Sequence, residues 1–434
     1  MTAVDGPATQ RSQLMTDRSF WGMTCTQFLG AFNDNLYKQL MLLLAIPVAV
    51  AGAEAAAGSD VQGWATLVFS LPFVLFSGFA GYLSDRFSKT PIIVWAKVAE
   101  IVIMLLGLLA FFYYTQLGMA GTWVVLFLMG TQSAFFGPGK YGILPELFPA
   151  RDLPRANGII LMSTFLAIIF GTVLAGALKE ALTGEGGATS NLWLGLVVCV
   201  AIAVVGTLTS LLVRRVPPAQ PGMPLTADCW GVSREVWHML QADRTLLGAL
   251  LVSSVFWLVS GLAVPTVNRL GLELLAVGDT KTSLLTASIG LGIMGGALFA
   301  SLLCRKGWGD LSVSLGLWGI LGSLVLLGLW SGQTHWLGFS GSIVALIAMG
   351  VFAAIFAIPI QVFLQERPPA SLKGRMIATM NQANFMGILI SGPLYQVFEA
   401  IAGWAGWPIC SVFLMMGLLV LPLAAFYRLR SNNR

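Results

Sequence analysis

Four polar residues interrupt the first long apolar segment of the chain, and their side chains have the clearest capacity for chemistry. They lie about halfway through residues 20–50 and are Asn33, Asp34, Asn35 and Lys38. A charged side chain at the centre of a bilayer costs about 2.5–3.5 kcal/mol on insertion scales, so such a residue usually faces a protein interior or water. Lys38 is suited to attract a phosphate, and Asp34 to attract an amine or a coupling cation. Because these two charges are four residues apart, a structural ion pair between packed helices is the alternative.

A second polar group lies in residues 120–147. Gln132 and Lys140 are eight residues apart and therefore share one face of a helix. The sequence Gly-Pro-Gly at residues 137–139 predicts that this helix is interrupted just before Lys140, because proline removes a backbone donor. Lys140 is a second candidate for binding a phosphate. The alternative is that its side chain extends toward the lipid headgroups at the membrane surface.

Two further pairs of polar residues lie inside apolar segments. Lys97 and Glu100 are three residues apart early in residues 91–114, and we interpret them as a structural pair or a conformational gate. Asn381 and Asn384 lie on one face of residues 375–400. These two side chains either line a cavity from the second half of the chain or hold one helix against another.

The charges that lie well inside the apolar segments all belong to the first half of the chain. The second half instead offers many glycines and a set of aromatic side chains, namely Phe256, Trp257, Phe356 and Phe385. A cavity with one polar wall and one apolar wall suits an amphiphile with a zwitterionic head and an acyl chain. It would also suit an amphipathic drug.

Membrane-spanning helices must position these residues. Of the 434 residues, 57% are hydrophobic and 10% are charged, whereas soluble domains carry about 25% charged residues. The sequence therefore predicts an all-α integral membrane protein, since apolar runs of spanning length recur along the chain. Twelve spans are predicted, over residues 20–50, 61–83, 91–114, 120–147, 155–179, 191–213, 245–270, 282–304, 310–332, 337–365, 375–400 and 404–427. The five cysteines show no metal-ligand spacing, and we expect no metal or other cofactor.

Basic residues fall mostly in connections on one side of these spans. Eighteen lysines and arginines lie on that side, against three on the other, which are Lys179, Arg269 and Lys281. The positive-inside rule then places both termini in the cytoplasm, as an even number of spans requires. The excess of basic residues thus reports topology, and we expect no nucleic-acid partner.

The longest connection divides the spans six and six. We predict a cytoplasmic tail at residues 1–19, a six-helix bundle at 20–213, a linker at 214–244, a second bundle at 245–428 and a tail at 429–434. The prolines of the linker suit an irregular segment, with a short surface helix around residues 233–241. The two halves also match at a constant offset of 220 residues, which pairs Gly130 with Gly350, Phe136 with Phe356 and Arg155 with Arg375. A parallel two-fold repeat follows, giving two pseudo-symmetric six-helix bundles.

The loop GYLSDRFSKTP at residues 81–91 resembles a signature of the major facilitator superfamily, found between its second and third helices. Ser88 stands where the family has glycine, and the matching residues are Gly81, Leu83, Asp85, Arg86 and Lys89. In such a tight turn Asp85 can meet a helix N-terminus or an arginine and hold one conformation. The resemblance implies that Asp85, Arg86 and Lys89 form a conformational gate.

Three stretches together resemble bacterial lysophospholipid transporters: GAFNDNLYKQ at residues 30–39, the turn just described and QSAFFGPGKYGILPELFP at 132–149. The resemblance implies a flippase in the bacterial inner membrane, surrounded by membrane lipid, that returns lysophosphatidylethanolamine and related lipids to the inner leaflet. Some members are fused to an acyltransferase and acyl-ACP synthetase, so here such a partner would be a separate protein. We expect a monomer. The expected substrate contacts are Asp34, Lys38 and Asn35 first, then Gln132 and Lys140, with Asn33, Asn381 and Asn384 completing the cavity.

Two other functions compete with this one. A cation-coupled exporter of amphipathic drugs or metabolites would use Asp34 as its titrating group. A membrane acyltransferase would use His238 and Asp243, which form the H-x4-D pattern of a general base and its orienting carboxylate. That pattern lies in a linker of about thirty residues, too short for a catalytic domain, so we attribute it to chance and expect no enzyme. No Gly-rich phosphate loop supports ATP-driven transport.

Overall fold

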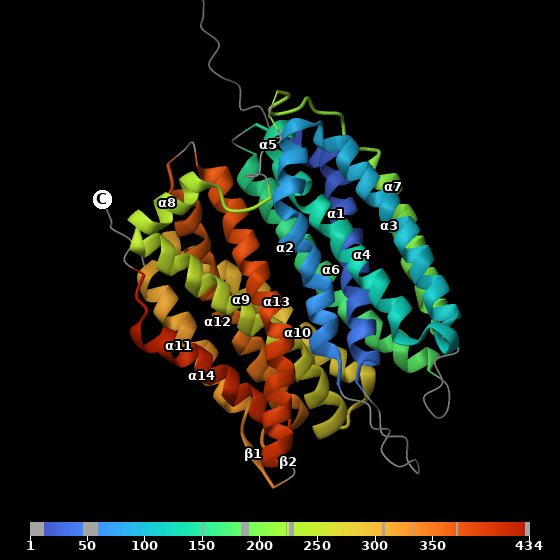
Figure 1. Cartoon of the computed structure of the whole chain (residues 1–434), viewed down its shortest axis with the longest axis vertical. Coiled ribbons are helices and arrows are strands. Elements are labelled where there is room, and N and C mark those ends of the chain that lie inside the picture. The colour runs from blue at the N-terminus through green and yellow to red at the C-terminus, as the bar shows by residue number, and fades with distance from the viewer. Residues whose placement is uncertain are drawn as a thin grey trace, which may run out of the picture.

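The computed structural model describes residues 13–46, 60–149, 152–183, 191–222, 224, 230–305, 309–332, 334–369 and 372–429. These residues fold into helices, as predicted, with one short hairpin (Figure 1). The first group of helices is η1 (Gln13–Thr16), α1 (Arg18–Leu44), α2 (Gln62–Arg86), α3 (Lys89–Phe112), α4 (Tyr114–Gly142), α5 (Leu144–Leu147), α6 (Leu153–Leu182) and α7 (Trp193–Ser210). The second group is α8 (Arg234–Ala242), α9 (Arg244–Arg269), η4 (Leu270–Leu274), α10 (Gly278–Arg305), α11 (Gly309–Leu327), β1 (Trp330–Ser331), β2 (Thr334–His335), α12 (Gly338–Glu366), α13 (Lys373–Ala405) and α14 (Ser411–Phe426).

The helices are long and apolar enough for a membrane protein. Within the described segments, ten helices meet the length and hydropathy of a membrane span, and α14 is a shorter apolar helix of 16 residues. Helix α1 has 27 residues but carries the polar group around Asp34. The all-α membrane fold is thus confirmed, while the count of twelve spans stays a prediction.

Each group has its own apolar core. The buried apolar residues of the first group form two clusters within residues 14–216, and those of the second group form one cluster within residues 236–429. In Figure 1 the two groups lie side by side, with α5 and α8 near the upper end and the hairpin at the lower end. We call the upper end, where α1 begins and α14 ends, the terminal end, and the lower end the opposite end.

The structure repeats the 220-residue offset seen in the sequence. Helices α3 and α11 start 220 residues apart, and so do α6 and α13. A Cβ atom on Gly130 of α4 would lie 2.4 Å from the carbonyl oxygen of Phe69 on α2. A Cβ atom on Gly350 of α12 would lie 2.2 Å from the carbonyl oxygen of Ile289 on α10, at the same offset for both partners. The equivalent crossings therefore need glycine for the same steric reason, and they support the predicted repeat.

The linker helix is present where the sequence predicts it. Ser233 caps α8, since its hydroxyl accepts a hydrogen bond from Val236 N at 3.5 Å. Asp243 caps α9 by accepting from Thr245 N and Leu246 N at 3.0 and 3.1 Å, and it pairs with Arg367 Nε at 2.9 Å. Although partial burial acts to raise the pKa of Asp243, the Arg367 hydrogen bond and the capped amides hold this pKa below its usual value. His238 is exposed, so the His238–Asp243 pattern joins a surface side chain to a helix cap.

The structure differs from the sequence prediction at one helix interruption and at two span boundaries. Helix α4 continues through residues 137–139 to Gly142, because neighbouring groups can satisfy the one carbonyl that Pro138 frees. Its non-helical residue is Gly118, with φ 55°, near the other end of the helix. The span predicted at 310–332 ends at Leu327 and gives way to the hairpin, in which Trp330 pairs with His335. The last span begins later than predicted, since α13 runs on to Ala405 and Gly406 ends it with φ 66°.

Candidate functional site

A cavity of about 280 Å³ begins beside α1 and continues into the second group of helices. Its first-group wall consists of Asn35, Lys38 and Gln39 on α1 with three residues of α6. Helices α9, α10, α11, α12 and α14 supply the rest, which is apolar except for two hydroxyl groups, Ser260 and Thr286. The predicted aromatic residues Phe256 and Trp257 line the cavity, while Phe356 packs against Phe256 with ring centroids 5.1 Å apart.

Asp34 and Lys38 do not form the ion pair that their spacing allowed. The ammonium of Lys38 lies 5.2 Å from the centroid of the Phe69 ring on α2, a favourable cation–π distance. Asp34 Oδ2 accepts a hydrogen bond from Ser133 Oγ on α4 at 2.6 Å. Asp34 Oδ1 is buried, and no hydrogen-bond partner faces it within the described part of the chain. Lys38 is therefore the charge at the cavity wall, and Asp34 turns toward α4.

A buried ion pair lies behind Asp34. Lys97 donates to Glu100 on the same helix, and the two side chains are 0% and 1% exposed. Asn33 Nδ2 donates to Glu100 Oε1 at 2.9 Å, and Gln132 Nε2 makes a long contact of 3.5 Å with Glu100 Oε2. Since both carboxylate oxygens have donors, the geometry compensates the desolvation of the charges. Asn33 is fully buried here, so this predicted substrate contact is separated from the cavity.

Ser133 joins the ion pair to Asp34. Its hydroxyl lies 2.6 Å from Asp34 Oδ2 and 3.1 Å from Gln132 Oε1, and Gln132 in turn contacts Glu100. The polar residues of α1, α3 and α4 thus form one connected cluster, which we call the first-group polar cluster: Asn33, Asp34, Lys97, Glu100, Gln132 and Ser133. Lys140 lies near enough to interact electrostatically with Asp34.

The two asparagines of α13 stand apart from the cavity. Asn384 is buried, and its Oδ1 accepts from Ser253 Oγ on α9 at 2.9 Å. This contact holds two helices of the second group together, the alternative that the sequence left open. Asn381 is exposed and is absent from the cavity wall.

The residues of the turn between α2 and α3 contact the first group and the start of the linker. Lys89 pairs with Glu146 on α5, and Arg86 donates to the hydroxyl of Tyr82 one turn earlier. The Asp85 carbonyl accepts from Gln220 N at 2.8 Å. The carboxylate of Asp85 interacts electrostatically with Lys89 and Glu146. In this conformation the turn is hydrogen-bonded to the start of the linker.

The opposite end holds a polar network that the sequence did not predict. Asn268 on α9 is its centre: its Oδ1 accepts from Gln39 on α1 at 2.8 Å, and its Nδ2 donates to Gln62 on α2 at 2.9 Å. Gln62 continues to Asp60 at 3.0 Å, and Asp60 accepts from the Tyr395 hydroxyl of α13 at 2.6 Å. The network therefore joins both groups across their interface.

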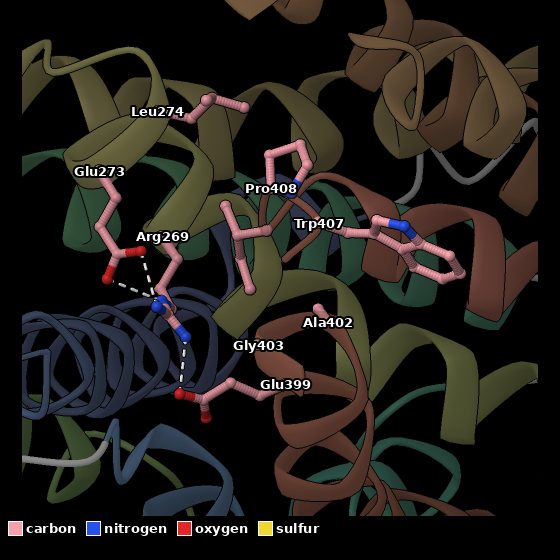
Figure 2. A pocket seen from close by; sticks show the side chains of 9 residues that line it. Arg269, Glu273, Leu274, Glu399, Ala402, Gly403, Trp407 and Pro408 are labelled. Atoms are coloured by element: carbon pink, nitrogen blue, oxygen red, sulfur yellow. Dashed lines mark hydrogen bonds and ion pairs between the residues drawn. The ribbon is translucent and has the colours of Figure 1, made fainter. Parts of the chain in front are cut away.

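Arg269 lies at the outer edge of this network, beside an open pocket of about 330 Å³ (Figure 2). Its guanidinium forms a two-point contact with Glu273, each N to O distance being 2.7 Å, and its Nη1 lies 2.7 Å from Glu399. Asp60 is 3.7 Å from Arg269 Nε. Nearby, Lys179 of α6 pairs with Asp279 of α10 at 2.7 Å. One signal in the sequence could have indicated this network. The few basic residues of this end have acidic residues close by in the sequence, as Arg269 has Glu273.

Close backbone contacts reinforce the junction of the two groups. A Cβ atom on Gly63 of α2 would lie 2.4 Å from the Gly392 carbonyl oxygen of α13. At mid-height, Phe73 stacks on Phe385 with ring centroids 4.0 Å apart. Toward the opposite end, the two helix groups are joined by the Asp60–Tyr395 hydrogen bond and the Lys179–Asp279 ion pair. The structure is therefore closed at the opposite end.

Comparison with known proteins places this arrangement in a family. A family model described as Major Facilitator Superfamily matches residues 23–393. The chain belongs to the Major Facilitator Superfamily. Solved structures with a similar fold include a POT family transporter in complex with a thioalcohol conjugated peptide. Its TM-score is 0.72 at 14% identity, with 94% of each chain covered. A mutant of the nucleoside transporter NupG has a TM-score of 0.66 at 13% identity, covering 95% of this chain and 98% of that one.

Curated members of this superfamily are similar over nearly the whole chain. The lysophospholipid transporter LplT of Enterobacter sp. (strain 638) is 27% identical, covering 94% of this chain and 96% of its own length. The protein of the same name from Klebsiella pneumoniae (strain 342) is 27% identical over 87% of this chain and 88% of its own. The resemblance drawn from the three sequence stretches is thereby confirmed.

Proposed function

We propose that this protein is a secondary transporter of lysophospholipids in the bacterial inner membrane. Its principal substrate on this proposal is lysophosphatidylethanolamine, which it moves from the outer to the inner leaflet by alternating access. The relatives named lysophospholipid transporter LplT support the substrate class. The observation that carries the proposal is the cavity, in which Lys38 and Asn35 form a polar wall opposite an apolar one.

The charges around the cavity fit the headgroup of such a lipid. Lys38 can attract the phosphate, because its ammonium lies over the Phe69 ring and interacts with the Asp34 carboxylate only at a distance, without a salt bridge within the described residues. Asp34 lies one turn earlier on α1 and can hold the amine through its unpartnered Oδ1. The apolar wall then receives the acyl chain. The same Asp34 oxygen is also where a coupling cation would bind.

The closed opposite end supports alternating access. With both termini in the cytoplasm, this conformation is the inward-facing one, and release would occur at the terminal end. Opening to the other leaflet requires the contacts of Asn268 with Gln39 and of Asp60 with Tyr395 to break while the terminal end closes. Such exchange by rocking of two helix bundles is the general transport mode of this architecture.

The test is a flipping assay in proteoliposomes with fluorescent lysophosphatidylethanolamine and a membrane-impermeant quencher. We expect the wild type to move the lipid, and Lys38→Ala or Asp34→Asn to slow this movement by about tenfold or more, equivalent to ~1.4 kcal/mol. The matched control is Lys281→Ala, since this exposed lysine lies over Phe339 at the opposite end, away from the cavity. All three variants should insert and unfold as the wild type does.

Two outcomes contradict the proposal. No lipid movement by the wild type, together with uptake of an amphipathic drug, would make the protein an exporter of such drugs. Unchanged rates in both Lys38→Ala and Asp34→Asn would show that these charges are structural. Accumulation of lysolipid in cells that lack the protein provides an independent check.

A further inference from the structure

The cavity beside Lys38 extends beyond the interface between the two helix groups and into the core of the second. Its far part is bordered by Leu317 and Ile320 on α11, Ala353 on α12, and Met416 and Val420 on α14. Each of these side chains is at most 9% exposed, and each belongs to the apolar core of the second group. Figure 1 shows α11 and α14 together on the flank of that group away from the first.

Protein cores rarely contain voids larger than a water molecule. The extension of this cavity, which has a total volume of about 280 Å³, into the core of the second group is therefore unusual. Larger apolar cavities remain dry and bind apolar molecules of matching shape. The far part of this cavity has no charged side chain among its lining residues, so its natural occupant is a hydrocarbon group.

The first group fills the equivalent place. At the 220-residue offset, Leu317 and Ile320 correspond to Lys97 and Glu100, and Ala353 corresponds to Ser133. In the first group these positions hold the polar cluster, with Lys97 paired to Glu100. The void is thus not imposed by the fold, because the repeated helices close the same place in the other half. It arises from the residues of the second group.

We propose that the interior of the second group is a binding site for the single acyl chain of an amphiphile whose anionic head lies at Lys38 and Asn35. The chain would enter beside Phe256 and end between α11 and α14. The whole cavity lies just below the usual range of ligand pockets, roughly 300–1,000 Å³, which favours an amphiphile with one acyl chain over a diacyl lipid. The proposed function identifies this amphiphile as a lysophospholipid; a fatty acid shares the same chemistry.

The first experiment uses the wild-type protein in detergent and a palmitoyl lysophospholipid with a photoreactive diazirine at the methyl end of its chain. After irradiation, mass spectrometry with fragmentation to single residues should locate the label on Leu317 or Met416. Excess unlabelled palmitoyl lysophospholipid should abolish this labelling, while a dipalmitoyl phospholipid should leave it. Competition by palmitate equal to that of the lysolipid would assign the site to fatty acids. Labelling confined to outward residues such as Leu315 or Leu418 would overturn the proposal.

The second experiment changes the depth of the cavity. Ala353→Phe should fill its far part and lower the affinity for palmitoyl lysophospholipid by about tenfold, while an octanoyl analogue binds as to the wild type. The matched control is Val344→Phe on the same helix, since Val344 is 67% exposed and lies outside the cavity wall. An unchanged chain-length preference in a folded Ala353→Phe protein would contradict the site. If that variant does not fold, the labelling of the wild type decides.

These outcomes separate the acyl-chain site from the proposed function. Labelling and affinity measure binding and need no transport. A wild type that flips lysolipid without labelling α11 or α14 keeps the proposed function and loses the site. A wild type that is labelled there but flips no lysolipid keeps the site and loses the function.

Discussion

The two helix groups use equivalent positions in opposite ways. Lys97 and Glu100 of α3 form a buried ion pair, whereas Leu317 and Ile320 of α11 border an apolar cavity. The helices around them cross in the same manner, as the paired glycines at 130 and 350 show. One half of the repeat has therefore been filled with charge and hydrogen bonds, and the other has been left open. The comparison indicates that buried charges stabilise the first half and that the second half has room for an apolar ligand.

The largest expected effect concerns the buried ion pair. Lys97→Leu should lower the free energy of unfolding by about 3–5 kcal/mol, because Glu100 then remains charged without a cation in an apolar interior. The double variant Lys97→Leu/Glu100→Gln should recover much of the loss, since a glutamine oxygen can still accept from Asn33. Thermal unfolding in detergent measures both. If the single variant is as stable as the wild type, the ion pair does not stabilise the first half and the contrast between the two halves fails.

The next effect compares the two cores directly. Leu317→Ala should cost only about 2 kcal/mol in the absence of lipid, and Leu196→Ala about 4 kcal/mol, within the range for such truncations. Leu317 already faces a void and has lost packing contacts on that side. Leu196 of α7 is 0% exposed and lies in the closed core of the first group. Denaturant unfolding of the purified variants measures the two free-energy losses. Equal losses would mean that Leu317 is as well packed as Leu196 and faces no void.

The smallest effect concerns the connections at the opposite end, where the halves also differ. Helices α3 and α4 join through Tyr113 alone, whereas α11 and α12 join through the hairpin that contains His335. His335 Nε2 donates to the Leu327 carbonyl oxygen at 2.8 Å. Burial lowers the pKa of His335 from its ordinary value of 6.5, although its backbone hydrogen bonds oppose this shift.

This pKa shift has a defined sign. The folded state favours neutral His335, so its stability should be complete above about pH 6.5 and decline as the pH falls toward the lowered pKa. Melting temperatures of the wild type and His335→Gln, measured from about pH 8 to about pH 5, test this effect. The variant should lose less stability on acidification than the wild type does. Parallel curves would mean that the hairpin tolerates a charged histidine.

Particular residues show how far the sequence could be interpreted. The depth of Asp34 and Lys38 in an apolar segment predicted that they face a protein interior, and Lys38 does line the cavity. Helical spacing allowed these two charges to pair, yet Lys38 lies over Phe69 and Asp34 accepts from Ser133. Spacing reports the face of a helix and not the side chains of the helix that packs against it. Depth in the same segment also placed Asn33 among the expected substrate contacts, and in the structure its side chain donates to Glu100.

The closed end was beyond the reach of sequence patterns. Asp60, Asn268 and Tyr395 belong to different segments far apart in the chain, and no local period relates them. Arg269 could be assigned to the face with few basic residues, but its contact with Glu399 depends on how α9 meets α13.

The sequence by itself determined the membrane class, the repeat at 220 residues, the linker helix and the unequal division of charge between the halves. These properties follow from hydropathy, periodicity and residue identity, which are local or additive along the chain. Only the tertiary structure decided which charges pair, where the cavity lies and which end is closed. Each of these depends on the contacts between helices, and in a membrane such contacts are set by close packing and hydrogen bonds between distant segments.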